Sequence, residues 1–163
     1  MKNRIEIIGK KLLVGKRTEM SYINDSTMEL WQSFMPARKQ IQDRVDSFYY
    51  SMQIYPSLFD YASFNPAINF TKWAAVEVSN HDHIPNQMEG YIIEGGTYGV
   101  FTHVGPASRF VQSMKYIYQI WLPESGYELD NREYFEILEE GYNPLDENAT
   151  EEIWIPITLK KKN

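Results

Sequence analysis

Cysteine is absent from the 163-residue sequence, and histidine occurs only three times. The first absence excludes disulfide bonds, thiolate metal sites and a cysteine nucleophile. Two of the histidines, His81 and His83, lie in a polar loop at residues 79–87, and their HxH pair has no third well-placed metal ligand. We therefore expect a solvated loop there, and neither a metal ion nor a cofactor in the protein.

Clustered positive charge and long apolar runs are also missing. The 22 acidic residues outnumber the 16 basic residues, which gives a net charge of −6 at pH 7. This balance argues against a nucleic-acid surface, because phosphates require clustered Lys and Arg. No segment approaches the length of a membrane span, and the N-terminus lacks the apolar core of a secretion signal. We expect a soluble, cytoplasmic protein with no direct contact to nucleic acid or membrane.

Aromatic residues, by contrast, are abundant: they make up 15% of the sequence, with 12 tyrosines and 4 tryptophans. This number exceeds what core packing needs, and amphipathic rings are common in pockets and interfaces. Together with the negative net charge, the aromatic content favours a small hydrophobic or cationic molecule as the partner.

Hydrophobic periodicity and turn residues predict the secondary structure. A helix is expected at about residues 27–41, after a capping pattern that begins at Ser26 and with Pro36 as a kink or an early end. A second helix begins at Pro106 and ends before Pro123. Strands are expected at residues 3–8, 11–20, 48–55, 73–78, 97–104, 134–138 and 152–159, with a loop rich in aromatic residues at 56–71.

The two halves of the chain resemble each other. The segment LWQSFMP at residues 30–36 matches IYQIWLP at residues 117–123, and two shorter matches follow at a nearly constant offset. Each half reads strand, helix, strand, strand, which predicts a duplicated βαββ unit. We therefore expect an α+β fold in a single domain over residues 1–163, with repeats at about residues 5–80 and 90–160. The two units would form a pseudo-twofold antiparallel sheet with the helices on one face and a ligand cleft on the other.

Strand alternation assigns side chains to the two faces of this sheet. In residues 152–159 the alternating isoleucines indicate the core face, and in residues 134–138 Phe135 and Ile137 are assigned to that face too. Residues 97–104 leave two choices open. Either Tyr98, Val100 and Thr102 face the cleft, or Gly99, Phe101 and His103 do. The residues that we assign to the cleft face are Glu136, Trp73, Trp154, Tyr50, Glu77 and Glu152, together with Tyr98 as a candidate wall.

Glu136 is the most informative of these residues. Glutamates in strands usually belong to a solvated face, and this interpretation is favoured for Glu77 and Glu152. Glu136 has bulky apolar neighbours in a central strand, so a buried carboxylate that awaits a positive partner is favoured there. Aromatic walls around a carboxylate suit an organic cation. His103 is expected to make a structural hydrogen bond instead.

The ordered segments GGTYGVFTHVGP, WLPESGYEL, YFEIL and EEIWIPI resemble the GyrI-like small-molecule-binding domain, also called the AraC-type or bacterial transcription activator effector-binding domain. The resemblance is strongest over residues 91–159 and weaker over residues 5–78. It implies two βαββ repeats around a ligand cleft, as in sensor domains of drug-responsive regulators, gyrase-interacting proteins and stand-alone chains. By motif match, the family's ligand-anchoring buried glutamate falls on Glu136. Where the family often has Tyr two residues later, this chain has Leu138.

Three functions follow from these patterns. We expect a stand-alone module that binds or senses hydrophobic, cationic or aromatic small molecules, with Glu136 as counter-charge and the Trp and Tyr rings as walls, because no helix-turn-helix segment precedes the resemblance. One alternative is a hydrolase of electrophilic, cyclopropane-type natural products, which some family members are, with Glu136 as general acid or base. The other is an inhibitor or partner of a protein such as gyrase.

Overall fold

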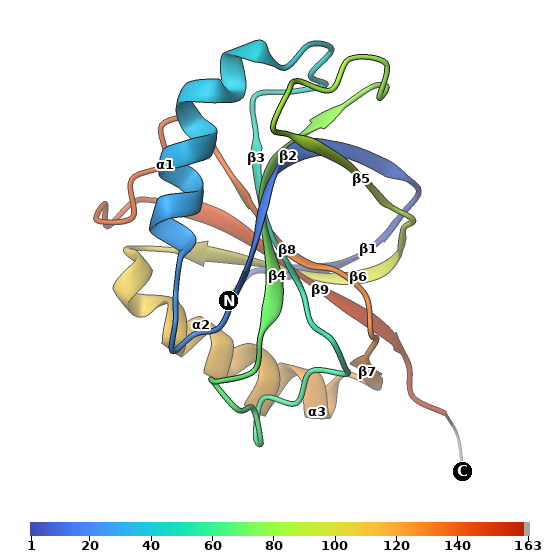
Figure 1. Cartoon of the computed structure of the whole chain (residues 1–163). Coiled ribbons are helices and arrows are strands. Elements are labelled where there is room, and N and C mark those ends of the chain that lie inside the picture. Colours follow the sequence, from blue (N-terminus) through green and yellow to red (C-terminus); the bar gives the residue numbers. More distant parts are fainter. Residues whose placement is uncertain (162–163) are drawn as a thin grey trace.

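The computed structural model describes residues 1–161. Within this range, nine strands form an antiparallel sheet that carries two helical segments (Figure 1), which confirms the α+β class. The strands are β1 (Asn3–Ile8), β2 (Lys11–Met20), β3 (Tyr49–Ile54), β4 (Phe70–Val78), β5 (Glu89–Ile93), β6 (Gly96–Val104), β7 (Tyr127–Leu129), β8 (Tyr134–Leu138) and β9 (Thr150–Leu159).

The sheet has the expected twofold pattern. Its strand order is β1-β6-β9-β8-β3-β4-β2-β5, and β7 pairs with one end of β9. Counted inward from its two ends, this order pairs each strand with its counterpart in the other half: β1 with β5, β6 with β2, β9 with β4, and β8 with β3. The last two strands lie side by side in the centre. There Ser51 of β3 lies opposite Glu136 of β8. The end strands are exchanged, because β1 pairs with β6 of the second half and β5 pairs with β2 of the first.

The first helix, α1, spans Thr27–Ala37, and a 3₁₀ turn at Arg38–Gln40 follows it. Pro36 lies in the last turn of α1, which agrees with the expected early end. Ser26 is the N-cap residue, but its side chain makes no capping hydrogen bond. The Asp25 carboxylate instead accepts a hydrogen bond from the backbone N–H of Thr27 at 2.9 Å. The helix start was therefore predicted correctly, and only the capping role expected of the Ser26 side chain is not observed.

The second helical segment changes its winding along its length. A 3₁₀ turn at Ala107–Arg109 leads into α2 (Phe110–Lys115), and a π-helical stretch at Tyr116–Trp121 leads into α3 (Leu122–Glu124). Phe110, Met114, Tyr118 and Trp121, which form the expected apolar stripe, pack against the buried cluster around Ile117. The segment thus covers the β6 and β9 half of the sheet.

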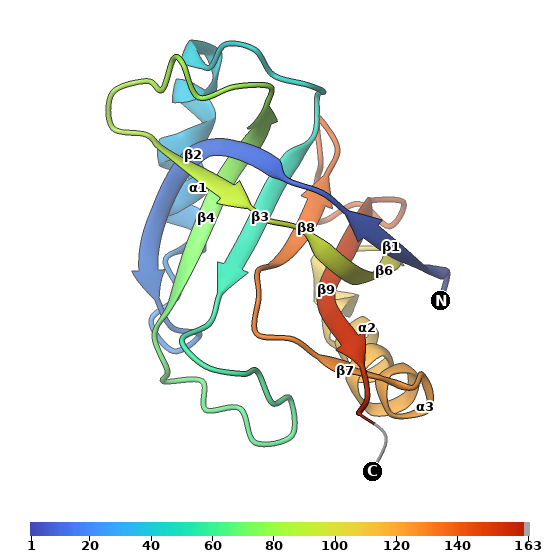
Figure 2. The same cartoon turned by 90° about the vertical axis from the view of Figure 1, so that its right-hand side faces the viewer.

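Both helical segments lie on one face of the sheet, here called the helix face (Figures 1 and 2). Two buried clusters fill the space beneath them, one around Phe34 below α1 and one around Ile117 below α2. The sheet curls on the opposite, helix-free face and encloses a third cluster there. Its largest members are Tyr50, Met52, Trp73, Tyr98, Phe135 and Trp154. The sheet is therefore buried on both faces.

Gly15 shows how tightly the strands approach one another. A Cβ atom at this position would overlap the backbone carbonyl oxygen of Ala74 and lie 2.6 Å from the Cα of Ala75. Gly15 ends the pairing of β2 with β5, where it lies opposite Glu89, while the pairing of β2 with β4 continues. Glycine is required here because no side chain fits between the two backbones.

Candidate ligand-binding site

Glu136 lies on the central strand β8, at the middle of the helix face. It pairs with Ser51 of β3 and with Ile153 of β9, and directly paired residues share a face of the sheet. Ile153 belongs to the cluster beneath α2. The Glu136 side chain therefore points into the space between the two helical segments.

This position corrects the expected assignment of β8 and, with it, the expected side of the cleft. Phe135 was assigned to the helix side, but it packs on the helix-free face, where its ring stacks on Trp154 at a centroid distance of 5.2 Å. Alternation did assign the faces of β4 and β9 correctly, since Val76 and Ile155 lie beneath the helices. It failed for β8 because the curled sheet has an apolar core on each face, and alternation does not tell which core the helices cover.

The other expected site residues lie together on the helix-free face. Tyr50, Trp73, Tyr98 and Trp154 are buried in the cluster on that face. Of the two choices left open for β6, the structure places Tyr98 there and Phe101 beneath α2. The structure thus separates these rings from the Glu136 carboxylate, although Trp154 also borders the cavity described below.

The two remaining glutamates are engaged by neighbouring cations. The Glu77 carboxylate accepts hydrogen bonds from the Lys11 ammonium and the Tyr50 hydroxyl, each at 3.2 Å. Glu152 accepts hydrogen bonds from the Arg4 guanidinium at 2.8 Å and from the Trp154 indole at 3.2 Å. Both carboxylates already have partners within the protein, which sets them apart from Glu136.

A cavity of about 560 Å³, here called the aromatic cavity, lies above Glu136 on the side of α2. The loop after β3 supplies much of its wall: Phe59 lies 5.0 Å from Tyr55 and 5.3 Å from Tyr118, measured between ring centroids. Tyr61 stacks on Tyr118 at 5.1 Å. Phe135 and Trp154 border the cavity from the sheet, and the other rings that line it are Tyr22, Tyr55, Phe59, Tyr61, Phe64, Phe110, Tyr118 and Tyr134. Of all these rings only Trp154 was assigned to the site from the sequence, although the aromatic content of residues 56–71 was a signal.

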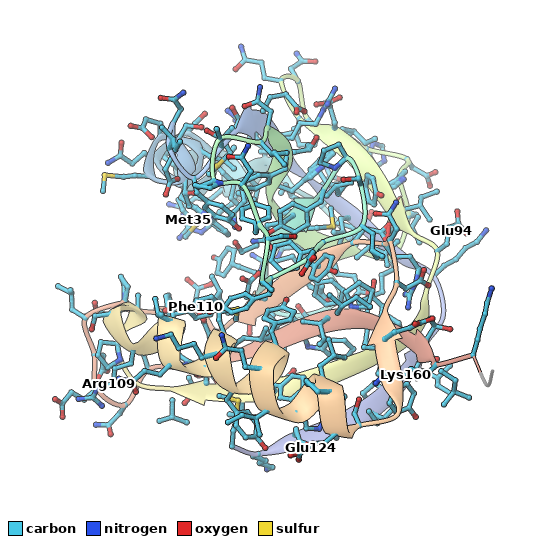
Figure 3. The ribbon with its side chains drawn as sticks, turned by 90° about the horizontal axis from the view of Figure 1, so that it is seen from below. Met35, Glu94, Arg109, Phe110, Glu124 and Lys160 are labelled. Carbon is cyan, nitrogen blue, oxygen red and sulfur yellow. The ribbon has the colours of Figure 1, made fainter. Side chains whose placement is uncertain are left out.

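A second cavity, of about 510 Å³ and here called the acidic cavity, lies on the side of α1. Trp31 and Met35 of α1 form part of its wall, and four carboxylates line it: Glu136, Glu139, Glu140 and Glu151. Among the described residues, Glu136 alone lines both cavities. Figure 3 shows Met35 and Phe110 facing each other across the space between the two helical segments. Glu136 thus lies at the boundary between two adjoining compartments.

Burial dominates the electrostatics of the Glu136 carboxylate. Its Oε2 atom is buried and has no hydrogen-bond partner among the described residues. Desolvation raises the pKa of Glu136, and the nearby charge of Lys72 and the side-chain amide of Gln53 only partly oppose this shift. The side chain is half-buried because it borders open cavity space. The carboxylate is therefore an acceptor held in place without a full set of partners.

Two more buried ionisable side chains lie on the same face of the sheet as Glu136. Lys72 of β4 is 8% exposed, and desolvation lowers the pKa of its ammonium group. Glu151 of β9 is 7% exposed, and burial, followed by the charge of Glu136, raises its pKa to about 7. Neither residue was a candidate from the sequence, because each lies just before the start of its expected strand, at residues 73–78 and 152–159, whereas the observed strands begin earlier.

The tyrosine hydroxyls of the aromatic cavity are only partly paired. The Tyr22 and Tyr55 hydroxyls share a hydrogen bond at 2.7 Å, whereas the buried Tyr134 hydroxyl lacks a partner in the described part of the chain. Burial raises the pKa of Tyr118 well above its usual value, so this phenol is neutral at physiological pH. The walls are therefore uncharged aromatic surfaces with hydroxyl groups at their edges.

The histidines lie away from both cavities. His103 is 3% exposed, and its Nδ1 shares a hydrogen bond of 2.7 Å with the Ser113 hydroxyl, in agreement with the expected structural role. His81 Nε2 lies 2.9 Å from the carbonyl oxygen of Leu13, where it donates a hydrogen bond that ties the 79–87 loop to β2. The HxH pair thus has one ring engaged with the backbone.

A family model for the GyrI-like small molecule binding domain matches residues 1–158. The chain belongs to this GyrI-like family. It is 28% identical over 147 residues to the transcriptional regulator BrlR of Pseudomonas aeruginosa. This match covers 89% of the chain and 51% of BrlR, so the GyrI-like chain spans about half the length of this curated relative.

Solved structures show the same GyrI-like fold. SAV2435 bound to tetraphenylphosphonium superposes with a TM-score of 0.73 at 16% identity, over 97% of this chain and 94% of that chain. The C-terminal domain of EcmrR superposes with a TM-score of 0.70 at 14% identity, over 98% of each chain.

The helices within residues 1–161 include none with the length and apolar character that a membrane span requires.

Proposed function

We propose that this GyrI-like domain binds a hydrophobic organic cation with aromatic substituents in the aromatic cavity, and that Glu136 supplies the counter-charge. The observation that carries the proposal is the buried Oε2 atom of Glu136, which lacks a hydrogen-bond partner in the described chain and lies at the floor of a cavity walled by aromatic rings. Such a module would sense its ligand by holding it rather than by converting it.

The physical argument rests on the cost of an unpaired buried carboxylate. Leaving such an acceptor unsatisfied costs about 1–3 kcal/mol or more, and a bound cation removes this cost. Ring faces attract a cation within about 6 Å of the centroid, which adds about 0.5–2 kcal/mol for each well-placed ring. A cavity of about 560 Å³ is also within the range of small-molecule sites.

A similar fold gives independent support. The solved structure of SAV2435 contains tetraphenylphosphonium, a cation surrounded by four aromatic rings. Tetraphenylphosphonium is therefore the first probe to test on this chain. Its charge cannot be neutralised by loss of a proton, so any dependence of its binding on pH reports on the protein.

Isothermal titration calorimetry with tetraphenylphosphonium tests the proposal. We expect Glu136→Gln to weaken binding at least about tenfold, which corresponds to about 1.4 kcal/mol. Glu77→Gln is the matched control, because Glu77 is a part-buried strand glutamate whose carboxylate contacts Lys11 and Tyr50 on the helix-free face. Equal affinity of wild type and Glu136→Gln would overturn the proposal.

A further inference from the structure

The acidic cavity adjoins the aromatic cavity but has a different character. Its described lining contains four carboxylates and no Lys, Arg or His. Trp31, Tyr49 and Tyr142 add aromatic surface to it. The described residues contain no group of three or more acidic, His or Cys side chains placed to hold a metal ion. These carboxylates therefore suit an organic cation better than a metal ion.

Glu151 is the buried carboxylate of this cavity. It is 7% exposed, it lies two residues before Ile153 on β9, and Ile153 is the direct partner of Glu136. The two glutamates are thus diagonal neighbours on the helix face, a relationship that places Cα atoms roughly 7–8 Å apart. Two carboxylates at this spacing, one at the boundary and one inside the acidic cavity, can each take a separate cationic group of one ligand.

A single buried cation does not balance this charge. The charge of Lys72 lowers the pKa of both Glu136 and Glu151. Within residues 1–161, however, no ion pair at 4.0 Å or less joins Lys72 to either carboxylate. Among the described residues, Lys72 lines neither cavity. Glu139 and Glu140 add further negative charge at the exposed rim of the acidic cavity. The helix face therefore has room for more than one positive group.

We propose that the site takes elongated ligands with two cationic groups, an aromatic cation in the aromatic cavity and an amine in the acidic cavity. Glu136 lies between the two groups, and Glu151 is the counter-charge of the amine. The inference rests on the proposed function, because it assumes that the first cation lies beside Glu136. It goes further in assigning the acidic cavity as the second half of the same site. Linking two cations in one molecule makes the second contact intramolecular and so raises affinity.

A matched pair of ligands tests the inference. Aminobutyl-triphenylphosphonium and pentyl-triphenylphosphonium have nearly the same size, but only the first carries a terminal amine, which is protonated at pH 7. Calorimetry on the wild-type protein should show the amine-bearing compound binding at least about tenfold tighter. A spacer series from ethyl to octyl should give the largest preference at an intermediate length, and this measurement needs no variant.

Variants then assign the effect to Glu151. Glu151→Gln should remove the preference for the amine and leave affinity for the pentyl compound within about twofold, whereas Glu136→Gln should weaken both compounds. Glu152→Gln, one residue further along but turned to the helix-free face, should keep the preference. Equal affinity of the two compounds for the wild type, or a preference that survives Glu151→Gln, would overturn the inference while leaving the proposed function intact. Failure of both compounds to bind the wild type would overturn the two together.

Discussion

Lys72 and Glu136 lie on the same face of the sheet, on β4 and β8, and burial shifts the pKa of each toward its neutral form. Lys72 pairs with Gln53, Gln53 pairs with Tyr134, and Tyr134 is two residues from Glu136. Each charge partly offsets the desolvation of the other, although the described structure has no ion pair between them within 4.0 Å. A buried lysine is thus electrostatically coupled to the carboxylate that we assign to ligand binding.

Replacing Lys72 should therefore move the titration of Glu136. The Lys72 ammonium favours the ionised carboxylate, so Lys72→Met should raise the pKa of Glu136 above its wild-type value. A ¹³C NMR titration of the side-chain carboxyl groups measures this shift. Lys16→Met is the control, because the Lys16 ammonium donates a hydrogen bond to Ser33. An unchanged Glu136 pKa in Lys72→Met would show that the two groups are not coupled.

Because of Glu151, the free energy of unfolding should decrease as the pH rises through the mildly acidic range. Its pKa of about 7 in the folded protein exceeds the value of 4.5 expected for an unperturbed Glu, so the folded state binds the extra proton. This proton stabilises the folded state fully below about pH 4.5. The stabilisation, on the order of 3 kcal/mol, is lost as the pH rises to about 7.

Chemical denaturation at several pH values tests this pH dependence. Glu151→Gln should lose much of the decline in unfolding free energy between pH 4.5 and 7, because glutamine does not titrate. Glu128→Gln on β7 should retain it, since this side chain is exposed. Parallel pH profiles for wild type and Glu151→Gln would contradict the assigned burial of the Glu151 charge.

The wall formed by Phe59 should contribute to ligand binding. Phe59→Ala should weaken tetraphenylphosphonium binding by about tenfold, because it removes a ring that contacts Tyr55, Phe64, Tyr118 and Tyr134. Leu58→Ala is the adjacent control, because Leu58 is 57% exposed and does not border the aromatic cavity in the described structure. Equal affinities for the two variants would place the ligand elsewhere.

Gly15 should be one of the least tolerant positions for stability. Gly15→Ala forces the β2 and β4 backbones apart at Ala74 and Ala75, and we expect a loss of about 1–3 kcal/mol or more in unfolding free energy. Gly9→Ala should be nearly neutral, because a Cβ there has no heavy atom within 4 Å. Urea denaturation of both variants measures the difference. A stable Gly15→Ala protein would show that the two strands lie further apart than described.

The sequence predicted the architecture well because architecture depends on patterns repeated along the chain. The seven expected strands, the early end of α1 near Pro36 and the duplicated halves all depend on local periodicity and turn residues, whereas β5 and β7 were not expected. The family resemblance, confirmed over residues 1–158, singled out Glu136 in advance. Its role in binding remains a prediction.

The surroundings of Glu136 were not predictable in the same way. The partners of a strand are set by register across the sheet, and this register places Ser51 opposite Glu136. The aromatic cavity uses a loop whose path no periodicity describes, so Phe59 and Phe64 gave only a compositional signal. Lys72 and Glu151 became notable only when long-range pairing buried them.

The exchanged end strands have a mechanical consequence. The halves of the chain are joined in three separate places, at β3 with β8, at β1 with β6 and at β5 with β2. A hinge opening between the two halves would break all three rows of backbone hydrogen bonds at once. Adjustment to ligands of different size must therefore come from the loop that carries Phe59 and Phe64, while the floor that carries Glu136 keeps its shape.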